Sequence, residues 1–317
     1  MARSLSSQSY TFDPRPNYPL LITAKRYWKP DSSHLNDPSA LTLIFTHGTG
    51  FHKEQWEPTI DEFYALLEGE NGSPKVREVW SIDAPNHGDA AVLNENVLLA
   101  YEPIFPWEEY ARAIHTFLTG FGTGVDVDFS TRRLVGIGHS MGAVCLLLSL
   151  GYSSNLKFES LIFCELMSMN PKFMKEPANM LTKGAINRRD TWSSHEEAYK
   201  LLKSRPAWKI WDDRVLKIFV KDGMRPLPTA DYPDKTEGVT LKCSRKQETA
   251  CYRDGIGPLR AYNFLGSVAR RMPVHLIYGA INDYLPQAIK DDIIEKSVGG
   301  INHLASFSRL EGAGHLV

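Results

Sequence analysis

The sequence has 317 residues, of which 43% are hydrophobic and 11% aromatic, enough to bury the core of one large α/β domain with an insertion or of two small domains. Its formal net charge of −1 gives no electrostatic basis for binding nucleic acid or an anionic membrane surface. Because no long apolar run or apolar signal segment is present, we expect neither a transmembrane helix nor secretion.

The four cysteines have no metal-binding spacing, and we expect neither a metal ion nor a cofactor. Cys145 and Cys164 lie in apolar runs and are expected to be buried thiols. Cys243 and Cys251 lie in a polar stretch, where a disulfide remains open. This pattern favours a reducing intracellular compartment.

The first strands end in a glycine-rich turn. Residues 18–27 alternate as in an edge strand, and residues 41–46 form a continuous apolar strand of the kind buried on both faces. The turn His47-Gly48-Thr49-Gly50 follows at once, where the backbone N–H of Thr49 could face an oxyanion. A plain strand-to-helix turn is the alternative interpretation. Residues 56–67 then predict an amphipathic helix.

Residues 76–83 predict the next strand, and the loop after it carries His87. We expect a structural role for His87, because its loop precedes the predicted nucleophile. Residues 105–120 predict a helix with one apolar stripe, which Gly120 ends.

A strand, a G-x-S-x-G pattern and a helix follow one another around Ser140. Residues 132–137 predict a strand with an apolar run at Leu134, Val135 and Ile137, Gly138-His139-Ser140-Met141-Gly142 comes next, and residues 143–148 predict a buried helix. This context is typical of a nucleophile elbow, a tight turn that exposes a serine hydroxyl. The backbone N–H of Met141 would then point to the position of an oxyanion.

After a buried strand at residues 160–164, which ends at Glu165, the strand–helix alternation stops. Residues 167–260 are rich in Met and Trp and predict a helical insertion that acts as a lid. These side chains could line an apolar pocket, could attach the insertion to the core, or could do both. We therefore expect a core part at residues 1–166, the lid at 167–260 and a second core part at 261–317.

The last part of the chain predicts two strands, each followed by a polar residue. Residues 274–278 precede Asp283, and residues 305–310 precede His315, with a helix at 286–297 between them. Strands that alternate with helices predict a mostly parallel central sheet flanked by helices.

The chain order Ser140, Asp283, His315 is that of a Ser-Asp-His triad on such a sheet. His315 would accept the proton of Ser140, and Asp283 would orient His315 and stabilise its imidazolium. Glu165, which also follows a buried strand, is the alternative acid.

Together with Asp83-Ala84-Pro85-Asn86-His87-Gly88, these motifs resemble the α/β-hydrolase fold family over residues 18–317. More narrowly, residues 45–54 and 25–28 resemble fungal hydrolases of the peroxisomal lipase type, including those of AK-toxin and AF-toxin biosynthesis clusters. This resemblance implies a serine hydrolase that cleaves an apolar ester or thioester, in secondary metabolism, in the peroxisome.

Three expectations accompany this resemblance. The sequence ends without an SKL-type tripeptide, so a cytoplasmic location is the alternative to the peroxisome. Only two residues follow His315, so we expect its side chain to be mobile and catalysis to be weak. The same triad could perform acyl transfer or C–C cleavage, and the fold could also serve an inactive binding protein.

Overall fold

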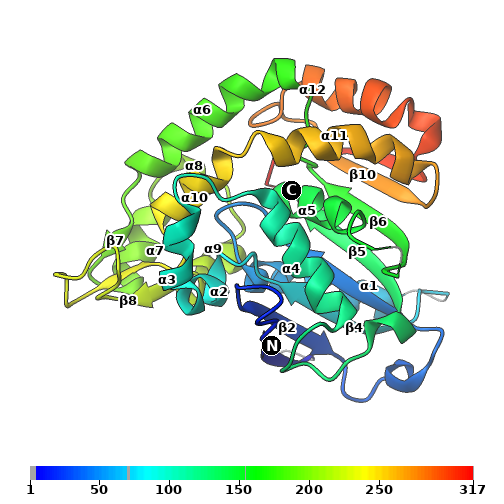
Figure 1. Ribbon diagram of the computed structural model, residues 1–317, viewed down its shortest axis with the longest axis horizontal. Helices are drawn as coiled ribbons and strands as arrows, with labels where there is room; N and C mark the ends of the chain where they lie inside the picture. Colours follow the sequence, from blue (N-terminus) through cyan, green and yellow to red (C-terminus); the bar gives the residue numbers. More distant parts are fainter. Residues whose placement is uncertain (1–4, 70–71, 154, 317) are drawn as a thin grey trace.

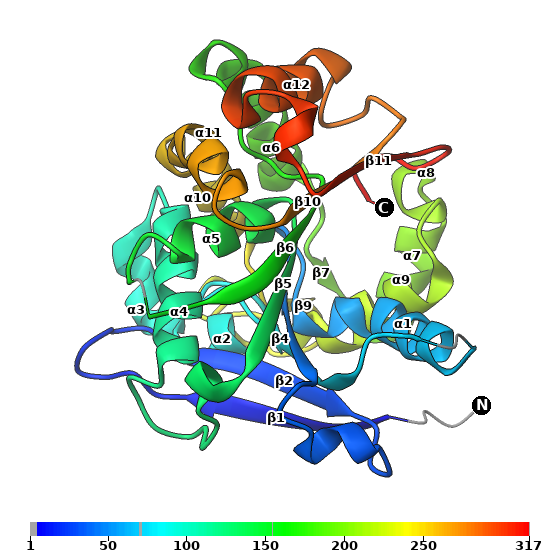
Figure 2. The ribbon, with the colours of Figure 1, turned by 90° about the vertical axis from the view of Figure 1, so that its right-hand side faces the viewer.

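The computed structural model describes residues 5–69, 72–153 and 155–316. Its centre is an eight-stranded sheet in the order β1-β2-β4-β3-β5-β6-β10-β11, which Figure 2 shows nearly edge-on. The strands are β1 (Ser6–Phe12), β2 (Ile22–Trp28), β3 (Leu41–Thr46), β4 (Val76–Ile82), β5 (Arg133–His139), β6 (Phe158–Cys164), β10 (Val274–Gly279) and β11 (Ser306–Leu310).

Six strands from β4 to β11 pair in parallel, whereas β1 and β2 are antiparallel to their neighbours. The mostly parallel sheet flanked by helices is therefore confirmed. The predicted edge strand near residues 18–27 is β2, and the edge position belongs to β1, whose exposed polar residues gave no strand pattern. In a parallel sheet, the loops at the carboxyl ends of neighbouring strands meet, which brings distant residues together.

Helices cover both faces of the sheet (Figures 1 and 2). The larger apolar core lies under α4, α5 and α11, and the smaller one lies between the opposite face and α1. The core helices are α1 (Glu57–Gly69), α2 (Gly88–Leu93), α3 (Glu95–Leu98), α4 (Trp107–Thr119), α5 (Met141–Ser149), α11 (Ile256–Ala269) and α12 (Gln287–Asp292), with a π-helical turn at Ile293–Val298.

The insertion between β6 and α11 is helical but also contains a small sheet that the sequence pattern did not predict. Its strands pair antiparallel in the order β7-β9-β8, and Figure 1 shows them beside α7 and α9. The elements are α6 (Pro171–Asn187), β7 (Thr191–Trp192), α7 (His195–Lys203), α8 (Pro206–Lys209), α9 (Asp213–Asp222), β8 (Met224–Pro226), β9 (Val239–Leu241) and α10 (Arg245–Tyr252). Strands of two or three residues are too short to show alternation.

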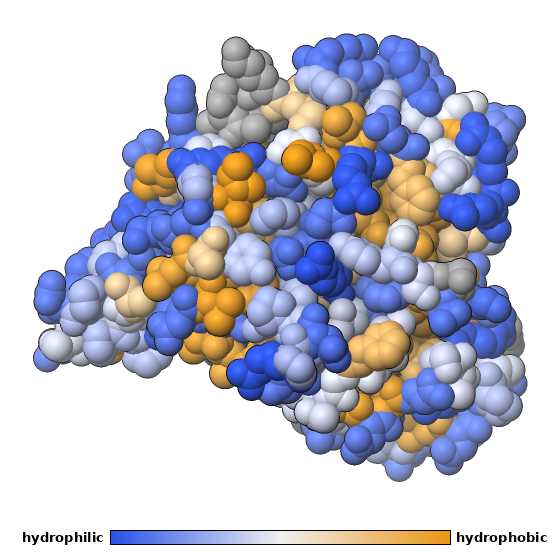
Figure 3. Space-filling model, viewed as in Figure 1, coloured by the Kyte–Doolittle hydropathy of each residue, from blue (hydrophilic) through white to orange (hydrophobic). Residues whose placement is uncertain are grey.

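The insertion has an apolar cluster of its own, which includes Trp192, Phe219 and Met224, with Trp208 and Trp211 packed against it. Figure 3 shows hydrophobic side chains among hydrophilic ones on the side where Figure 1 places α6 to α10. The boundary expected at residue 260 falls inside α11, whose buried side chains belong to the main core.

The structure also bears on the membrane-spanning helix and the cysteines considered from the sequence. In the described part of the chain, no helix is both long and apolar enough to cross a membrane. All four cysteines, Cys145, Cys164, Cys243 and Cys251, are free thiols, and Cys145 is fully buried. The disulfide left open for Cys243 and Cys251 is therefore not formed.

Candidate active site

Ser140 lies in the sharp turn between β5 and α5. Its backbone has φ 54° and ψ −118°, a left-handed conformation that is unfavourable for a residue with a side chain. A Cβ atom on Gly142 would come within 2.5 Å of the carbonyl oxygen of Thr46, so only glycine fits there. The turn predicted from the pattern thus forms, and its close packing requires the flanking glycine.

The imidazole of His315 connects Ser140 to a carboxylate. Its Nε2 lies 3.0 Å from Ser140 Oγ, and its Nδ1 lies 3.0 Å from Glu165 Oε2. Glu165 is fully buried, and Ser140 and His315 are each 7% exposed. When Nδ1–H donates to the carboxylate, Nε2 is left as an acceptor for the serine hydroxyl. A nucleophile, a base and a group that orients the base are therefore within hydrogen-bond reach.

The contact expected between Asp283 and the imidazole of His315 is not formed, which corrects the expected geometry. Asp283 is exposed, and its two carboxylate oxygens accept the backbone N–H of His315 at 3.0 and 2.9 Å. Glu165 stands at the imidazole because its backbone, with φ 50°, turns the side chain across to the end of β10. There its Oε1 accepts the N–H of Gly279 at 2.6 Å.

His139 also holds His315, a contact that the sequence did not indicate. Its Nε2–H donates to the backbone carbonyl of His315 at 2.8 Å. Burial, together with the neighbouring His315, lowers the pKa of His139 to about 3, so the ring is neutral near pH 7. Because both backbone groups of His315 are bonded and its side chain is buried, the reason for expecting a mobile His315 does not hold.

The two residues proposed to donate to an oxyanion lie side by side. Met141 is the first residue of α5, where backbone N–H groups have no partner within the helix and the helix dipole favours an anion. Thr49 Oγ1 donates to the sulfur of Met141 at 3.2 Å, and Thr49 and Ser140 line the same cavity. That their backbone N–H groups donate to an oxyanion stays a prediction.

Two buried histidines hold the loops beneath the site. His87 Nε2 accepts the backbone N–H of Gly50 at 2.9 Å, and His47 Nε2 accepts that of Ala84 at 3.0 Å. Burial lowers the pKa of His47 to about 4 and that of His87 well below its usual value, so both act as neutral acceptors. The structural role expected for His87 therefore has a physical basis, because its ring fixes the turn that carries Thr49.

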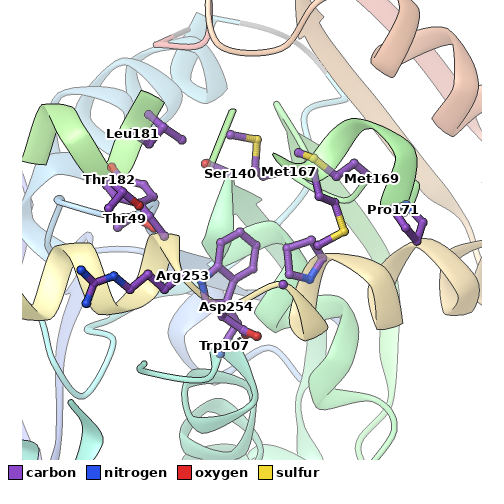
Figure 4. Close-up of a pocket in the computed structure, with 14 residues that line it drawn as sticks. Thr49, Trp107, Ser140, Met167, Met169, Pro171, Leu181, Thr182, Arg253 and Asp254 are labelled. Carbon is purple, nitrogen blue, oxygen red and sulfur yellow. Dashed lines mark hydrogen bonds between the residues drawn. The ribbon is translucent and has the colours of Figure 1, made fainter. Parts of the chain in front are cut away.

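A cavity of about 460 Å³ opens beside Ser140. In Figure 4, Met167 and Met169 lie on one side of Ser140, and Thr49 and Leu181 lie on the other. The side chains around it are mainly apolar and come from α4, α6, α11 and the segment after β6: Trp107, Met167, Met169, Pro171, Met174, Leu181 and Pro258. The methionines expected at a pocket are thus present, whereas the tryptophans of the insertion pack in its own core.

The polar groups of the cavity wall are largely engaged. The carboxylate of Asp254 accepts the backbone N–H of Trp107 at 2.7 Å and also faces the N–H of Gly257. Across the described residues, no three His, Cys, Asp or Glu side chains are grouped so that they could hold a metal ion. The cavity is therefore mainly apolar, and Ser140 lies at its wall.

A sequence profile described as the alpha/beta hydrolase family matches residues 43–317. The type I acyl-CoA thioesterase mpaH of Penicillium brevicompactum is 31% identical over 220 residues, which are 68% of this chain and 47% of that protein. The peroxisomal membrane protein LPX1 of Saccharomyces cerevisiae is 25% identical over 261 residues, 78% of this chain and 64% of that protein. The chain thus spans about half the length of the first of these relatives.

Solved structures share the fold. The peroxisomal alpha-beta-hydrolase Lpx1 from Saccharomyces cerevisiae has a TM-score of 0.71 at 22% identity, over 100% of this chain and 85% of that one. The thioesterase domain from the curacin biosynthetic pathway has a TM-score of 0.62 at 15% identity, over 98% of this chain and 94% of that one. At these identities the likeness establishes the arrangement of the backbone.

Proposed function

The chain belongs to the alpha/beta hydrolase family, and from this premise we propose that it is a serine hydrolase that cleaves a carboxylic ester or thioester. The observation that carries the proposal is the hydrogen-bonded series from Ser140 Oγ through the His315 imidazole to the Glu165 carboxylate. Glu165 takes the role of the acid. Asp283 instead supports the backbone of His315.

In the first half of the reaction, Ser140 Oγ attacks the carbonyl carbon of the substrate and its proton passes to His315 Nε2. The buried carboxylate of Glu165 stabilises the imidazolium that forms. The carbonyl oxygen becomes an oxyanion, to which the backbone N–H groups of Thr49 and Met141 donate, an effect of about 3–4 kcal/mol for each donor. The tetrahedral intermediate then expels the leaving alcohol or thiol, which takes the proton from Nε2.

The second half repeats these steps with water. His315 Nε2 accepts a proton from a water molecule whose oxygen attacks the acyl group on Ser140. The second tetrahedral intermediate releases the carboxylic acid, and Ser140 Oγ recovers its proton from Nε2. The protein is unchanged at the end, and the net reaction is hydrolysis.

For the substrate, we propose an apolar acyl group in the cavity, with its carbonyl carbon at Ser140. The methionine side chains beside Ser140 suit an acyl chain because they are flexible and polarizable. A thioester agrees with the names of two similar proteins, the acyl-CoA thioesterase mpaH and the thioesterase domain from curacin biosynthesis. A role in toxin or other secondary-metabolite biosynthesis stays a prediction from the sequence resemblance.

A fluorophosphonate probe tests the mechanism. We expect covalent labelling of the wild-type protein and none of Ser140→Ala, while Ser267→Ala, an exposed serine on α11, labels like wild type. The same three proteins are then assayed with p-nitrophenyl esters and with acyl-CoA thioesters. A folded wild-type protein that neither labels nor hydrolyses would overturn the proposal in favour of a binding protein.

For the location, we propose the peroxisome, because the yeast relative LPX1 is named a peroxisomal membrane protein. The test is a fluorescent fusion in the native host, compared with a peroxisomal marker. Diffuse fluorescence throughout the cytoplasm would support the alternative.

A further inference from the structure

Lys290, on α12, brings a fully buried ammonium group to the back of the active site. Its Nζ donates to the backbone carbonyl of Gly279 at 2.7 Å and lies 3.4 Å from the carbonyl of Ile281. It also lies 3.4 Å from Glu165 Oε1, and both side chains have no exposed surface. Figures 1 and 2 both show α12 near β10, the strand that ends at Gly279.

A buried ammonium is costly unless its charge is paired and its donors are satisfied. Here two carbonyls and one carboxylate surround a group that has three N–H donors. Lys290 therefore sits in a site built for a cation, and the charge that balances it is that of Glu165.

The carboxylate of Glu165 is held on both of its oxygens. Oε2 faces His315 Nδ1, while Oε1 faces the Gly279 N–H and the ammonium of Lys290. The same ammonium binds the carbonyls that begin the loop carrying Asp283, whose carboxylate holds the backbone of His315. The Lys290 side chain thus contacts both Glu165 and the loop of Asp283, the two groups that hold His315 in place.

We propose that Lys290 is a positioning residue of the hydrolytic site, which holds Glu165 oriented on His315 and offsets part of its negative charge. The inference rests on the proposed function, because it assigns to Lys290 a task in that same reaction. It adds an electrostatic effect to the triad, since a cation behind the acid disfavours the imidazolium of His315.

Among the groups that face His315 and Glu165, Lys290 is the cationic side chain in contact with Glu165. Burial raises the pKa of Cys164 to about 12, also raises that of Tyr278, and lowers that of His139 to about 3, so these neighbours are neutral near pH 7. Besides Lys290, the titratable side chains and the nucleophile that face the pair are Ser140, His139, Asp283, Tyr284, Cys164 and Tyr278. Asp283 faces the backbone N–H of His315 and not its imidazole.

The test is the pH dependence of kcat/KM for Lys290→Gln, which removes the charge and keeps an N–H donor. Loss of the cation stabilises the imidazolium, so we expect the acidic limb of the profile to move up by about one pH unit. Lys290→Arg, which keeps the charge, should restore the limb. Lys296→Gln, which removes an exposed ammonium paired with the buried Asp292, is the matched control and should leave the limb in place.

Unchanged acidic limbs in a folded, active Lys290→Gln protein would overturn the inference. If that variant does not fold, the double variant Glu165→Gln/Lys290→Gln decides, because it removes both charges together. If the double variant folds, as measured by circular dichroism, the pairing of the two charges is supported. If it does not fold, Lys290 is needed for packing and the inference is overturned. The proposed function has a separate test. It is contradicted if a folded Ser140→Ala protein still hydrolyses the ester.

Discussion

His139 Nε2 donates to the backbone carbonyl of His315 at 2.8 Å, so the residue before the proposed nucleophile holds the proposed base. The rings of the two histidines lie 5.1 Å apart, and Asp283 holds the backbone N–H on the other side. His315 is therefore fixed at both of its peptide groups although it lies close to the end of the sequence. Its position is set by contacts with β5 and with the loop after β10.

We expect His139→Ala to lower kcat by about 10- to 100-fold with little change in KM, because a shift of about 1 Å in a catalytic group costs rate and not substrate binding. Steady-state kinetics on an ester substrate measure this. The control is His115→Ala on α4, whose ring contacts Tyr152, away from the site. An increase in KM at constant kcat would show that His139 acts on the substrate instead.

Glu165→Gln should reduce kcat by about 10³-fold or more, the scale of losses seen for triad acids, because Gln cannot stabilise the imidazolium. Asp283→Asn should cost about tenfold or less, since its amide oxygen can still accept the N–H of His315. Both variants are compared by single-turnover and steady-state rates at equal folded concentration. A larger loss for Asp283→Asn would return the role of acid to Asp283.

Longer acyl chains should be hydrolysed with higher kcat/KM until the cavity is full, because each buried CH₂ adds about 0.8 kcal/mol, or about fourfold. Met174→Trp should lower the chain length at which kcat/KM peaks, since Met174 lines the cavity. Met180→Trp, on the same helix but 52% exposed, is the control. Equal kcat/KM from acetyl to decanoyl esters would refute an acyl pocket.

Acid should destabilise the fold through its buried histidines. Burial lowers the pKa of His47 from 6.5 to about 4 and that of His139 to about 3, so the unfolded chain binds protons below pH 6.5 that the folded chain does not. Their contribution is present above pH 6.5 and is lost as the pH falls, by about 1.4 kcal/mol per proton and pH unit.

Urea unfolding at a series of pH values measures this loss. The side-chain oxygen of Gln in His47→Gln can still accept the N–H of Ala84. This variant should reduce the slope of the free energy of unfolding against pH, between pH 6 and 4, by the amount that corresponds to about one proton. An unchanged slope would mean that His47 is protonated in the folded protein.

The elements that carry the site were predictable from sequence because their signals are local. The strand at residues 41–46 matches β3, and the glycines around Ser140 predicted the turn that the structure contains. By contrast, the polar sequence of β1 and the two- or three-residue strands of the insertion give no periodic signal, and they form through pairing with distant segments.

The choice between two acids could not be made from local pattern. Glu165 and Asp283 both follow strands, and β6 and β10 are neighbours in the sheet, so both carboxylates end near His315. What separates them is the left-handed backbone of Glu165, and a non-glycine residue gives no sequence signal for that conformation. The contact of His139 with a residue 176 positions away was likewise unpredictable.

Ser140 and Glu165 are the non-glycine residues with positive φ among the described residues, and they hold the two ends of the proposed relay. A left-handed conformation of this kind costs a residue with a Cβ about 1–2 kcal/mol. At both positions glycine would suit the backbone better and would end the chemistry. The proposed active site and the stability of the fold therefore make opposing demands on the same two residues, and selection for thermal resistance alone would erode the activity here first.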